Sequence, residues 1–121
     1  MVWIAGDDRR VPFWSARRRT SGNWSEGVLS RDRGIAYRHY CEKAAAHPNG
    51  VGCHYFQCYD QFVLGRFDGE NYNIGLFDIC SQPYPDMMEQ IKLCSSEIYE
   101  VADGQKEPCE EKADSIPMIA Y

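Results

Sequence analysis

The part of the sequence richest in residues that could do chemistry is GRFDGENYNIGLFD, from Gly65 to Asp78. It places an arginine, acids, asparagines and a tyrosine around three glycines and then becomes apolar. Charged groups and amides offer paired hydrogen-bond donors and acceptors, and aromatic rings offer flat apolar faces. A sugar has hydroxyl groups around the edge of its ring and C–H bonds on its faces. This mixture of side chains therefore favours carbohydrate binding.

Two other interpretations of this loop stay open at this point. Asp68-Gly69 is a common turn dipeptide, so the polar residues could form ordinary turns. Phosphate binding has less support, because neither GxGxxG nor GxxxxGK occurs in the sequence. The loop from Asp60 to Asn73 is, however, longer than the usual connection of about two to six residues, and long loops are usually functional.

The loop lies between segments that predict an α/β arrangement. Apolar residues recur at helical spacing in residues 31–47, with Asp32 placed to cap the start of a helix. Val51–Tyr59 is apolar on both faces and too short for a helix, which predicts a buried strand of a parallel sheet. Ile74–Ile79 predicts a second short extended segment. Helix, turn and buried strand together form the αβ half of an α/β unit.

A second helix is predicted after the loop. Pro83-Tyr84-Pro85 opens it, since proline suits the first turn of a helix. Its core-facing stripe is spaced four, three, four and three residues apart and consists of Met87, Ile91, Cys94, Ile98 and Val101. The helix is expected to end near Gly104, and the charged residues that follow are expected to be a linker or a frayed end.

Length and composition predict one globular domain of 121 residues. Apolar residues make up 44% of the chain, aromatic residues make up 13%, and no apolar run approaches the ~20 residues that span a bilayer. We therefore expect no membrane partner. The net charge of -5 is unevenly spread, because residues 1–33 hold seven arginines against four acids. Nucleic-acid binding by Arg17-Arg18-Arg19 is the alternative to a solvated arginine run, and we expect no nucleic-acid partner.

Six cysteines are irregularly spaced and predict reduced, buried thiols rather than a disulfide scaffold. The alternatives are a redox module or a zinc site made of Cys53, His54, Cys58 and Cys80. No CxxC pair is present, and adjacent residues on a strand point to opposite faces. We expect neither a metal nor another cofactor.

Residues 52–91, GCHYFQCYDQFVLGRFDGENYNIGLFDICSQPYPDMMEQI, closely resemble the end of the catalytic barrel of agarase-type glycoside hydrolases, which are related to barrel β-galactosidases. Members of that family show a pattern like HWFQYxD, then TGRxxDGENYNxGFVD, then PYPE. The similarity extends over about residues 27–100. Tyr55 stands where the family usually has tryptophan, and Cys58 stands where it usually has an aromatic residue.

The resemblance implies the C-terminal fragment of a (β/α)8 TIM barrel, consisting of a helix, the last strand, a long loop with a short strand, and a closing helix. It divides the chain into an atypical Arg/Trp-rich segment at 1–26, the end of the barrel at 27–103 and a charged tail at 104–121. One strand cannot close a barrel, so both edges of residues 51–59 would lack partners. The missing part of the barrel is therefore a candidate partner.

The resemblance also implies a binding surface for a galactan oligosaccharide or polysaccharide. The residues at matching motif positions are His54, Tyr55, Gln57, Asp60, Arg66, Asp68, Glu70, Asn71 and Asn73. Retaining glycosidases need two carboxyl groups roughly 5 Å apart, which the related barrels carry on glutamates of earlier strands. Glu70 belongs to the binding motif, so we predict no catalytic residue in this chain. The expected function is a partial agarase-like hydrolase that is inactive alone, and the alternative is a non-catalytic galactoside-binding module or a non-functional fragment.

Overall fold

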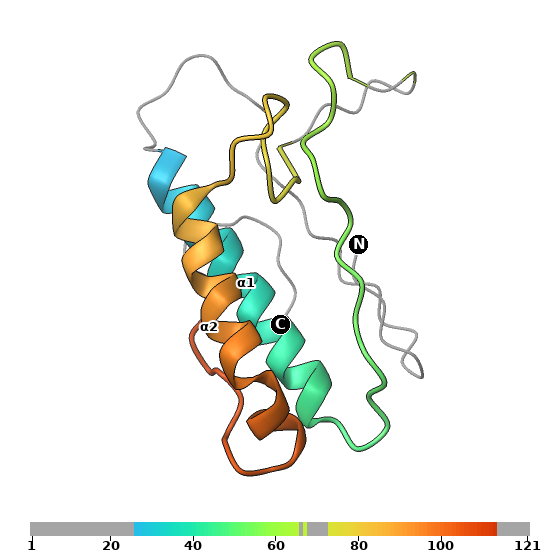
Figure 1. The fold of residues 1–121 in the computed structure, drawn as a ribbon, viewed down its shortest axis with the longest axis vertical. Helices are drawn as coiled ribbons and strands as arrows, with labels where there is room; N and C mark the ends of the chain where they lie inside the picture. The colour runs from blue at the N-terminus through green and yellow to red at the C-terminus, as the bar shows by residue number, and fades with distance from the viewer. Residues whose placement is uncertain (1–25, 66, 68–72, 114–121) are drawn as a thin grey trace.

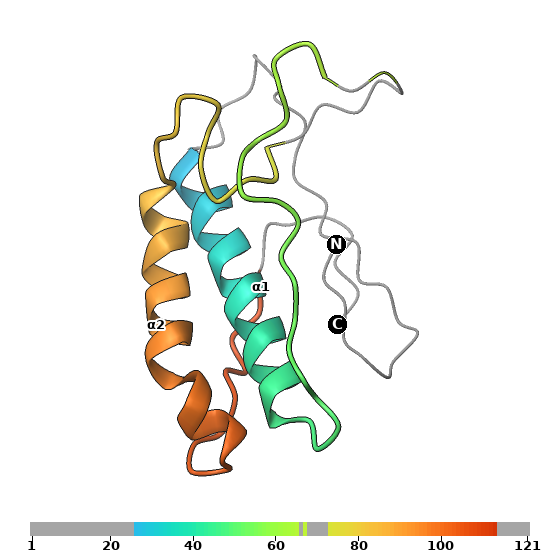
Figure 2. The ribbon, with the colours of Figure 1, turned by 45° about the vertical axis from the view of Figure 1, so that its right-hand side comes forward.

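The structure, a computed structural model, describes residues 26–65, 67 and 73–113. Its described part contains two helices. Helix α1 spans Glu26–Ala46 and helix α2 spans Pro85–Ala102. The helices lie side by side and run in the same direction (Figure 1). Residues 51–59, called the extended segment below, return along α1 in the opposite direction. Both views place α1 between α2 and the extended segment (Figures 1 and 2).

Helix α2 forms as the sequence predicts. It starts at Pro85 and ends where the N–H of Asp103 donates to the carbonyl oxygen of Tyr99, at 2.9 Å. Gly104 follows with a positive φ of 72°, a conformation that suits glycine. The predicted core stripe is confirmed at Met87, Cys94 and Val101, which are buried, whereas Ile91 and Ile98 are only partly buried.

Helix α1 begins earlier than predicted, so one sequence expectation is wrong. Asp32 lies inside the helix and is 6% exposed, and it therefore does not cap the helix start. Apolar residues Ile35, Ala36 and Ala44 are buried on this helix together with polar residues. The mixture has a structural reason, because α1 is contacted by α2, by the extended segment and by the residues that follow α2. Within the described ranges, neither helix is both long and apolar enough to cross a membrane.

The two helices approach closely at Gly34. A Cβ atom built on Gly34 would lie 2.8 Å from Cβ of Gln90 and 3.0 Å from Cα of Met87. A side chain at this position would overlap the facing helix, so the glycine permits the close contact. The predicted stripe on α2 therefore packs against α1.

Residues 103–113 do not behave as the expected linker or frayed end. The carboxylate of Glu42 on α1 accepts the backbone N–H of Cys109 at 2.7 Å. Lys43 pairs with Glu110, and Arg31 pairs with Glu111 at 3.1 Å. Ala113 is buried together with Ile35 and Ala36 of α1. This part of the charged tail therefore packs along α1. The residues after 113 lie outside the described structure.

The two predicted strands are not formed as strands in the described part of the chain. Tyr59 makes an isolated parallel bridge to Phe77, and Phe77 makes an isolated antiparallel bridge to Pro83. Within the extended segment, Cys53 and Tyr55 are partly covered on the side of α1, while His54 and Phe56 are exposed. The alternation is that of a strand with one covered face, but a ladder requires a neighbouring strand. The sequence pattern predicted a strand buried on both faces, and this prediction is wrong for the described structure: one face of the extended segment is open to solvent and its pairing is limited to isolated bridges.

Candidate functional site

Asp60 is the centre of a hydrogen-bonded cluster at the end of the extended segment. It is 7% exposed, and its Oδ1 accepts the backbone N–H of Gly75 at 2.8 Å. Its Oδ2 accepts the hydroxyl of Tyr84, and the same hydroxyl accepts a hydrogen bond from Nδ2 of Asn73 at 3.2 Å. We call Asp60, Asn73, Gly75 and Tyr84 the Asp60 clasp. The clasp brings two predicted site residues, Asp60 and Asn73, into one network with the start of α2.

Gly75 allows the two segments of the clasp to meet. A Cβ atom at this position would lie 2.2 Å from the backbone nitrogen of Asp60 and 2.3 Å from the carbonyl oxygen of Phe77. Those two atoms are themselves hydrogen-bonded, because the N–H of Asp60 donates to that oxygen at 2.9 Å. The rings of Tyr59 and Phe77 pack beside this contact, with 5.6 Å between their centres. The absence of a side chain at Gly75 is therefore a requirement of the site.

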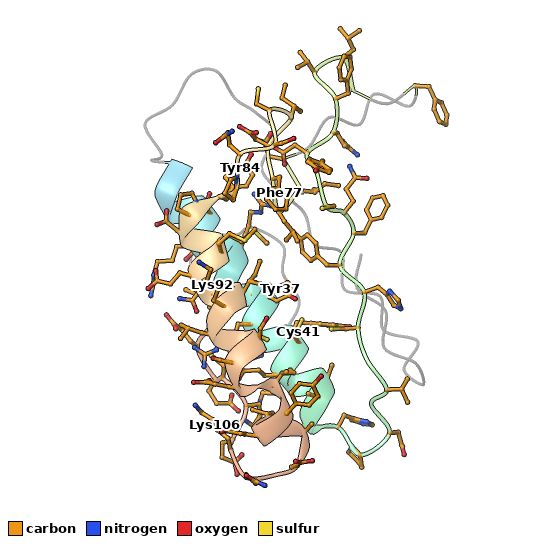
Figure 3. All side chains as sticks on the ribbon, viewed as in Figure 1. Tyr37, Cys41, Phe77, Tyr84, Lys92 and Lys106 are labelled. Atoms are coloured by element: carbon orange, nitrogen blue, oxygen red, sulfur yellow. The ribbon has the colours of Figure 1, made fainter. Side chains whose placement is uncertain are left out.

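Arg33 lies against Tyr84 of the clasp, and neither residue was predicted from the sequence to belong to the site. Tyr84 precedes α2 with an extended backbone, and Figure 3 shows it close to Phe77 near the start of that helix. The guanidinium carbon of Arg33 lies 5.0 Å from the centre of the Tyr84 ring, in a cation–π arrangement. Nη2 of Arg33 also donates to the carbonyl oxygen of Gly75. Arg33 is 6% exposed, so α1 contributes a buried cation to the clasp.

The surroundings of Tyr84, in the clasp, and of Tyr55, next to it, keep both tyrosine hydroxyls protonated. Burial, together with the hydrogen bond to Asp60, raises the pKa of Tyr84 to about 12. Burial also raises the pKa of Tyr55, whose hydroxyl donates to the carbonyl oxygen of Ile74 at 2.8 Å. Because both carboxylate oxygens of Asp60 already accept hydrogen bonds, Asp60 is placed to brace the loop rather than to exchange protons with a substrate.

The raised pKa of Tyr84 predicts a loss of stability at high pH. The folded state holds the Tyr84 proton more tightly than the unfolded state, whose tyrosine pKa is ~10. The stabilisation is therefore complete below about pH 10 and is lost as the pH rises from there through about 12. We expect the urea midpoint of the wild type to fall more steeply over this range than that of Tyr84→Phe. Tyr99→Phe, which removes a hydroxyl from a residue 81% exposed, is the control.

The other predicted site residues take different positions. The ring of Tyr55 packs edge-on against Tyr37 of α1, with 5.6 Å between the ring centres. Tyr55 thus links α1 to Ile74, whose carbonyl oxygen accepts its hydroxyl. His54 is exposed on the opposite side of the extended segment. Nε2 of Gln57 donates to the carbonyl oxygen of Tyr59 at 2.9 Å, next to a cis peptide bond between Phe56 and Gln57. The remaining predicted site residues lie outside the described part of the chain, namely Arg66, Asp68, Glu70 and Asn71.

Aromatic rings are exposed on the extended segment and on the residues that follow it. Phe56 and Tyr59 are each 49% exposed, and Phe62 and Phe67 are 67% and 99% exposed. A sugar ring can stack its C–H faces on such aromatic surfaces, while hydrogen-bonding groups contact its hydroxyls. Over the described residues, no group of three or more histidines, cysteines and acids is placed to hold a metal ion.

Known proteins share this part of the sequence. No family model matches the chain. Beta-agarase B of Vibrio sp. (strain JT0107) is 37% identical over 84 residues, and beta-agarase A of the same strain is 39% identical over 74 residues. The chain is similar to a part of the agarase-type glycoside hydrolases. The two matches cover 65% and 57% of this chain but only 9% and 7% of the agarases, so the chain spans less than a tenth of either relative.

A solved structure supports the same relationship. The structure of PfGH50B, a GH50 enzyme of the TIM-barrel type, superposes with a TM-score of 0.57 and 35% sequence identity. The match covers 60% of this chain and 11% of the PfGH50B chain. The resemblance found in the sequence is therefore confirmed, and the arrangement of helices is consistent with a fragment of such an enzyme.

Proposed function

We propose that the chain is the C-terminal part of the catalytic barrel of an agarase-like glycoside hydrolase, whose complete form hydrolyses β-galactosidic bonds in agarose-type galactans. The Asp60 clasp carries this proposal, because it fixes the long polar loop at both of its ends. Asp60 and Asn73 are the two ends of the loop and both are hydrogen-bonded to Tyr84, while Gly75 just after the loop is hydrogen-bonded to Asp60. The names of the two relatives, both beta-agarases, support the galactan as substrate.

This chain binds sugar in the proposed function and does not cleave it. Asp60 is buried and both of its oxygens accept hydrogen bonds within the protein. Arg66, Asp68, Glu70 and Asn71 occupy the loop that the clasp holds, where donors and acceptors would contact sugar hydroxyls. The catalytic carboxyl pair of a retaining glycosidase has to stand roughly 5 Å apart across the scissile bond. In this proposal that pair comes from the rest of the barrel.

The rest of the barrel is also the proposed partner of the exposed side of this chain. Large apolar side chains are open to solvent on the residues that follow α1, with Val51 83%, Phe62 67% and Leu64 85% exposed. The extended segment has only one face covered by α1. Apolar side chains that are exposed over a contiguous segment mark a surface that another part of a protein covers. Neighbouring strands would cover this face and pair with the backbone of the extended segment.

A chimera tests the proposed function. Residues 27–103 replace the matching segment of beta-agarase B, and the release of new reducing ends from agarose is measured. We expect the chimera to hydrolyse agarose, and we expect Asp60→Ala in the same chimera to lose most of that activity because the loop is no longer held. Glu89→Ala, on the exposed side of α2, is the matched control. A chimera with intact circular dichroism but no activity would contradict the proposal.

The alternative function is a galactoside-binding module that works without hydrolysis. The exposed rings of Phe56, Tyr59, Phe62 and Phe67 favour it, since they are available in this chain without other strands. The isolated chain is titrated with agaro-oligosaccharides, and binding is monitored through the backbone amide resonances of the clasp. This experiment distinguishes the binding module from the hydrolase fragment. Binding at millimolar or lower concentration without product would support the module. Hydrolysis by the isolated chain would instead show that it holds its own catalytic groups.

A further inference from the structure

Three cysteines from three different segments meet beside α1. Cys41 is buried on α1, and its Sγ lies 3.2 Å from Sγ of Cys53 on the extended segment. Cys94 of α2 is hydrogen-bonded to Cys41 from the other side. Figure 3 shows Cys41 one turn after Tyr37, with its side chain toward the extended segment. All three are free thiols.

The two facing thiols differ in access and in acidity. Cys53 is partly exposed, and its hydrogen bond with Cys41 lowers the pKa of Cys53 to about 7. The same hydrogen bond, the one with Cys94 and burial raise the pKa of Cys41. Cys53 is thus the more accessible and the more acidic of the two thiols, and Cys41 is its buried neighbour. An accessible low-pKa thiolate beside a second cysteine is the usual arrangement of a thiol–disulfide exchange site.

We propose that Cys41 and Cys53 form a thiol–disulfide exchange site that takes a low-molecular-weight disulfide, such as oxidised glutathione, and joins the extended segment to α1. This site is independent of the sugar-binding proposal, because neither cysteine belongs to the Asp60 clasp. The contact joins two segments that are separated by a turn. The structure therefore supplies both partners of the bond at contact distance.

The reaction proceeds by two exchanges. The thiolate of Cys53 attacks one sulfur of the glutathione disulfide, the S–S bond breaks, and one glutathione thiolate leaves. Cys41 then gives up its proton and attacks Sγ of Cys53, which releases the second glutathione thiolate. The protein loses two hydrogens and is oxidised by two electrons, and one glutathione disulfide is reduced to two glutathione thiols. The reverse exchange with reduced glutathione opens the bond.

The bond would hold the first part of the extended segment, around Cys53. In the described part of the chain, no backbone–backbone hydrogen bond is made by Gly52, Cys53 or His54. The extended segment leads directly to Asp60, so a covalent link at Cys53 would restrain the approach to the clasp. The oxidised chain is therefore expected to hold its loop in a narrower range of conformations than the reduced chain.

Mass spectrometry of the full chain tests this site. The chain is equilibrated in glutathione buffers with an excess of the disulfide, remaining thiols are alkylated, and tryptic peptides are analysed without reduction. We expect most of the chain to lose two hydrogens and to yield a Cys41–Cys53 linked peptide. Cys53→Ser should abolish that peptide, whereas Cys58→Ser, which alters an exposed thiol, should leave it unchanged.

Three results would overturn the inference. They are a Cys41–Cys94 link in place of Cys41–Cys53, glutathione retained as an adduct on Cys53, and oxidation confined to exposed cysteines. Cys53→Ala is a second variant. We expect it to give no linked peptide and an unchanged circular dichroism spectrum; a changed spectrum would reveal a folding defect. Proteolysis between residues 47 and 64 gives an independent readout, because the linked chain should be cleaved more slowly than the reduced chain.

Discussion

Replacing Glu42 with alanine is expected to lower the free energy of unfolding by about 3 kcal/mol. Glu42 is fully buried in α1 (0% exposed). Its Oε1 accepts Nε–H of Arg38 at 2.7 Å, and its Oε2 accepts the backbone N–H of Cys109 at 2.7 Å. Alanine leaves the partly buried N–H of Cys109 without its acceptor and removes one of the two carboxylates that pair with Arg38. The other, Glu97 of α2, lies 2.5 Å from Nη2 of Arg38, which places the loss at the lower end of the range for buried pairs.

Urea denaturation followed by circular dichroism measures this loss. A small domain is stable by only about 5–15 kcal/mol, so the expected shift of the midpoint is large. Glu111→Ala is the matched control, because Glu111 and Arg31 form an ion pair with side chains 46% and 56% exposed. Exposed pairs contribute about 1 kcal/mol or less. Equal losses in the two variants would show that the buried carboxylate does not hold α1, α2 and residues 103–113 together.

Replacing Gly75 with alanine is expected to open the Asp60 clasp. The added Cβ would lie 2.2–2.3 Å from three backbone atoms, on Asp60, Phe77 and Tyr59. Backbone atoms cannot rotate away as a flexible side chain can, so the two segments have to separate. The separation removes the backbone bond from Asp60 to Phe77 and the bond from Gly75 to Oδ1 of Asp60. We expect about 1–3 kcal/mol of destabilisation, together with loss of sugar binding by the loop.

Hydrogen exchange of individual amides distinguishes this local opening from a general loss of stability. The amides of Asp60, Leu76 and Phe77 donate hydrogen bonds at the clasp, and we expect them to exchange at least ~10-fold faster in Gly75→Ala. Gly104→Ala is the control, since it introduces the same methyl group into open space at another loop. The positive φ of Gly104 makes that change mildly destabilising, but the clasp amides should keep their relative protection. Uniform acceleration in both variants would contradict the predicted role of Gly75.

The Asp60 clasp shows which parts of a site a sequence reveals. Asp60 and Asn73 were predicted because they match motif positions of the agarase-type hydrolases that the chain resembles, and the structure joins them in one network. Tyr84 was read only as part of a proline-rich helix start, and Arg33 only as a residue of the arginine-rich first third. Their roles depend on α1 and α2 lying in parallel, which brings residues 33 and 84 together across a long sequence separation. A clue for Tyr84 was present, because it stands in the Pro-Tyr-Pro motif that the related hydrolases share.

The sequence by itself determined both helices, most of the core stripe of α2, the extended conformation of residues 51–59 and the relationship to agarase-type hydrolases. These features depend on local periodicity and on consecutive residues, which a single chain displays directly. Only the tertiary structure decided that Asp32 and Glu42 are buried, that residues 103–113 lie along α1, and that Cys41 meets Cys53. It also decided that the predicted strands form only isolated bridges, because pairing requires a neighbour that a strand's own sequence does not contain. Burial and pairing are properties of contacts between distant segments, and those contacts exist only once the chain has folded.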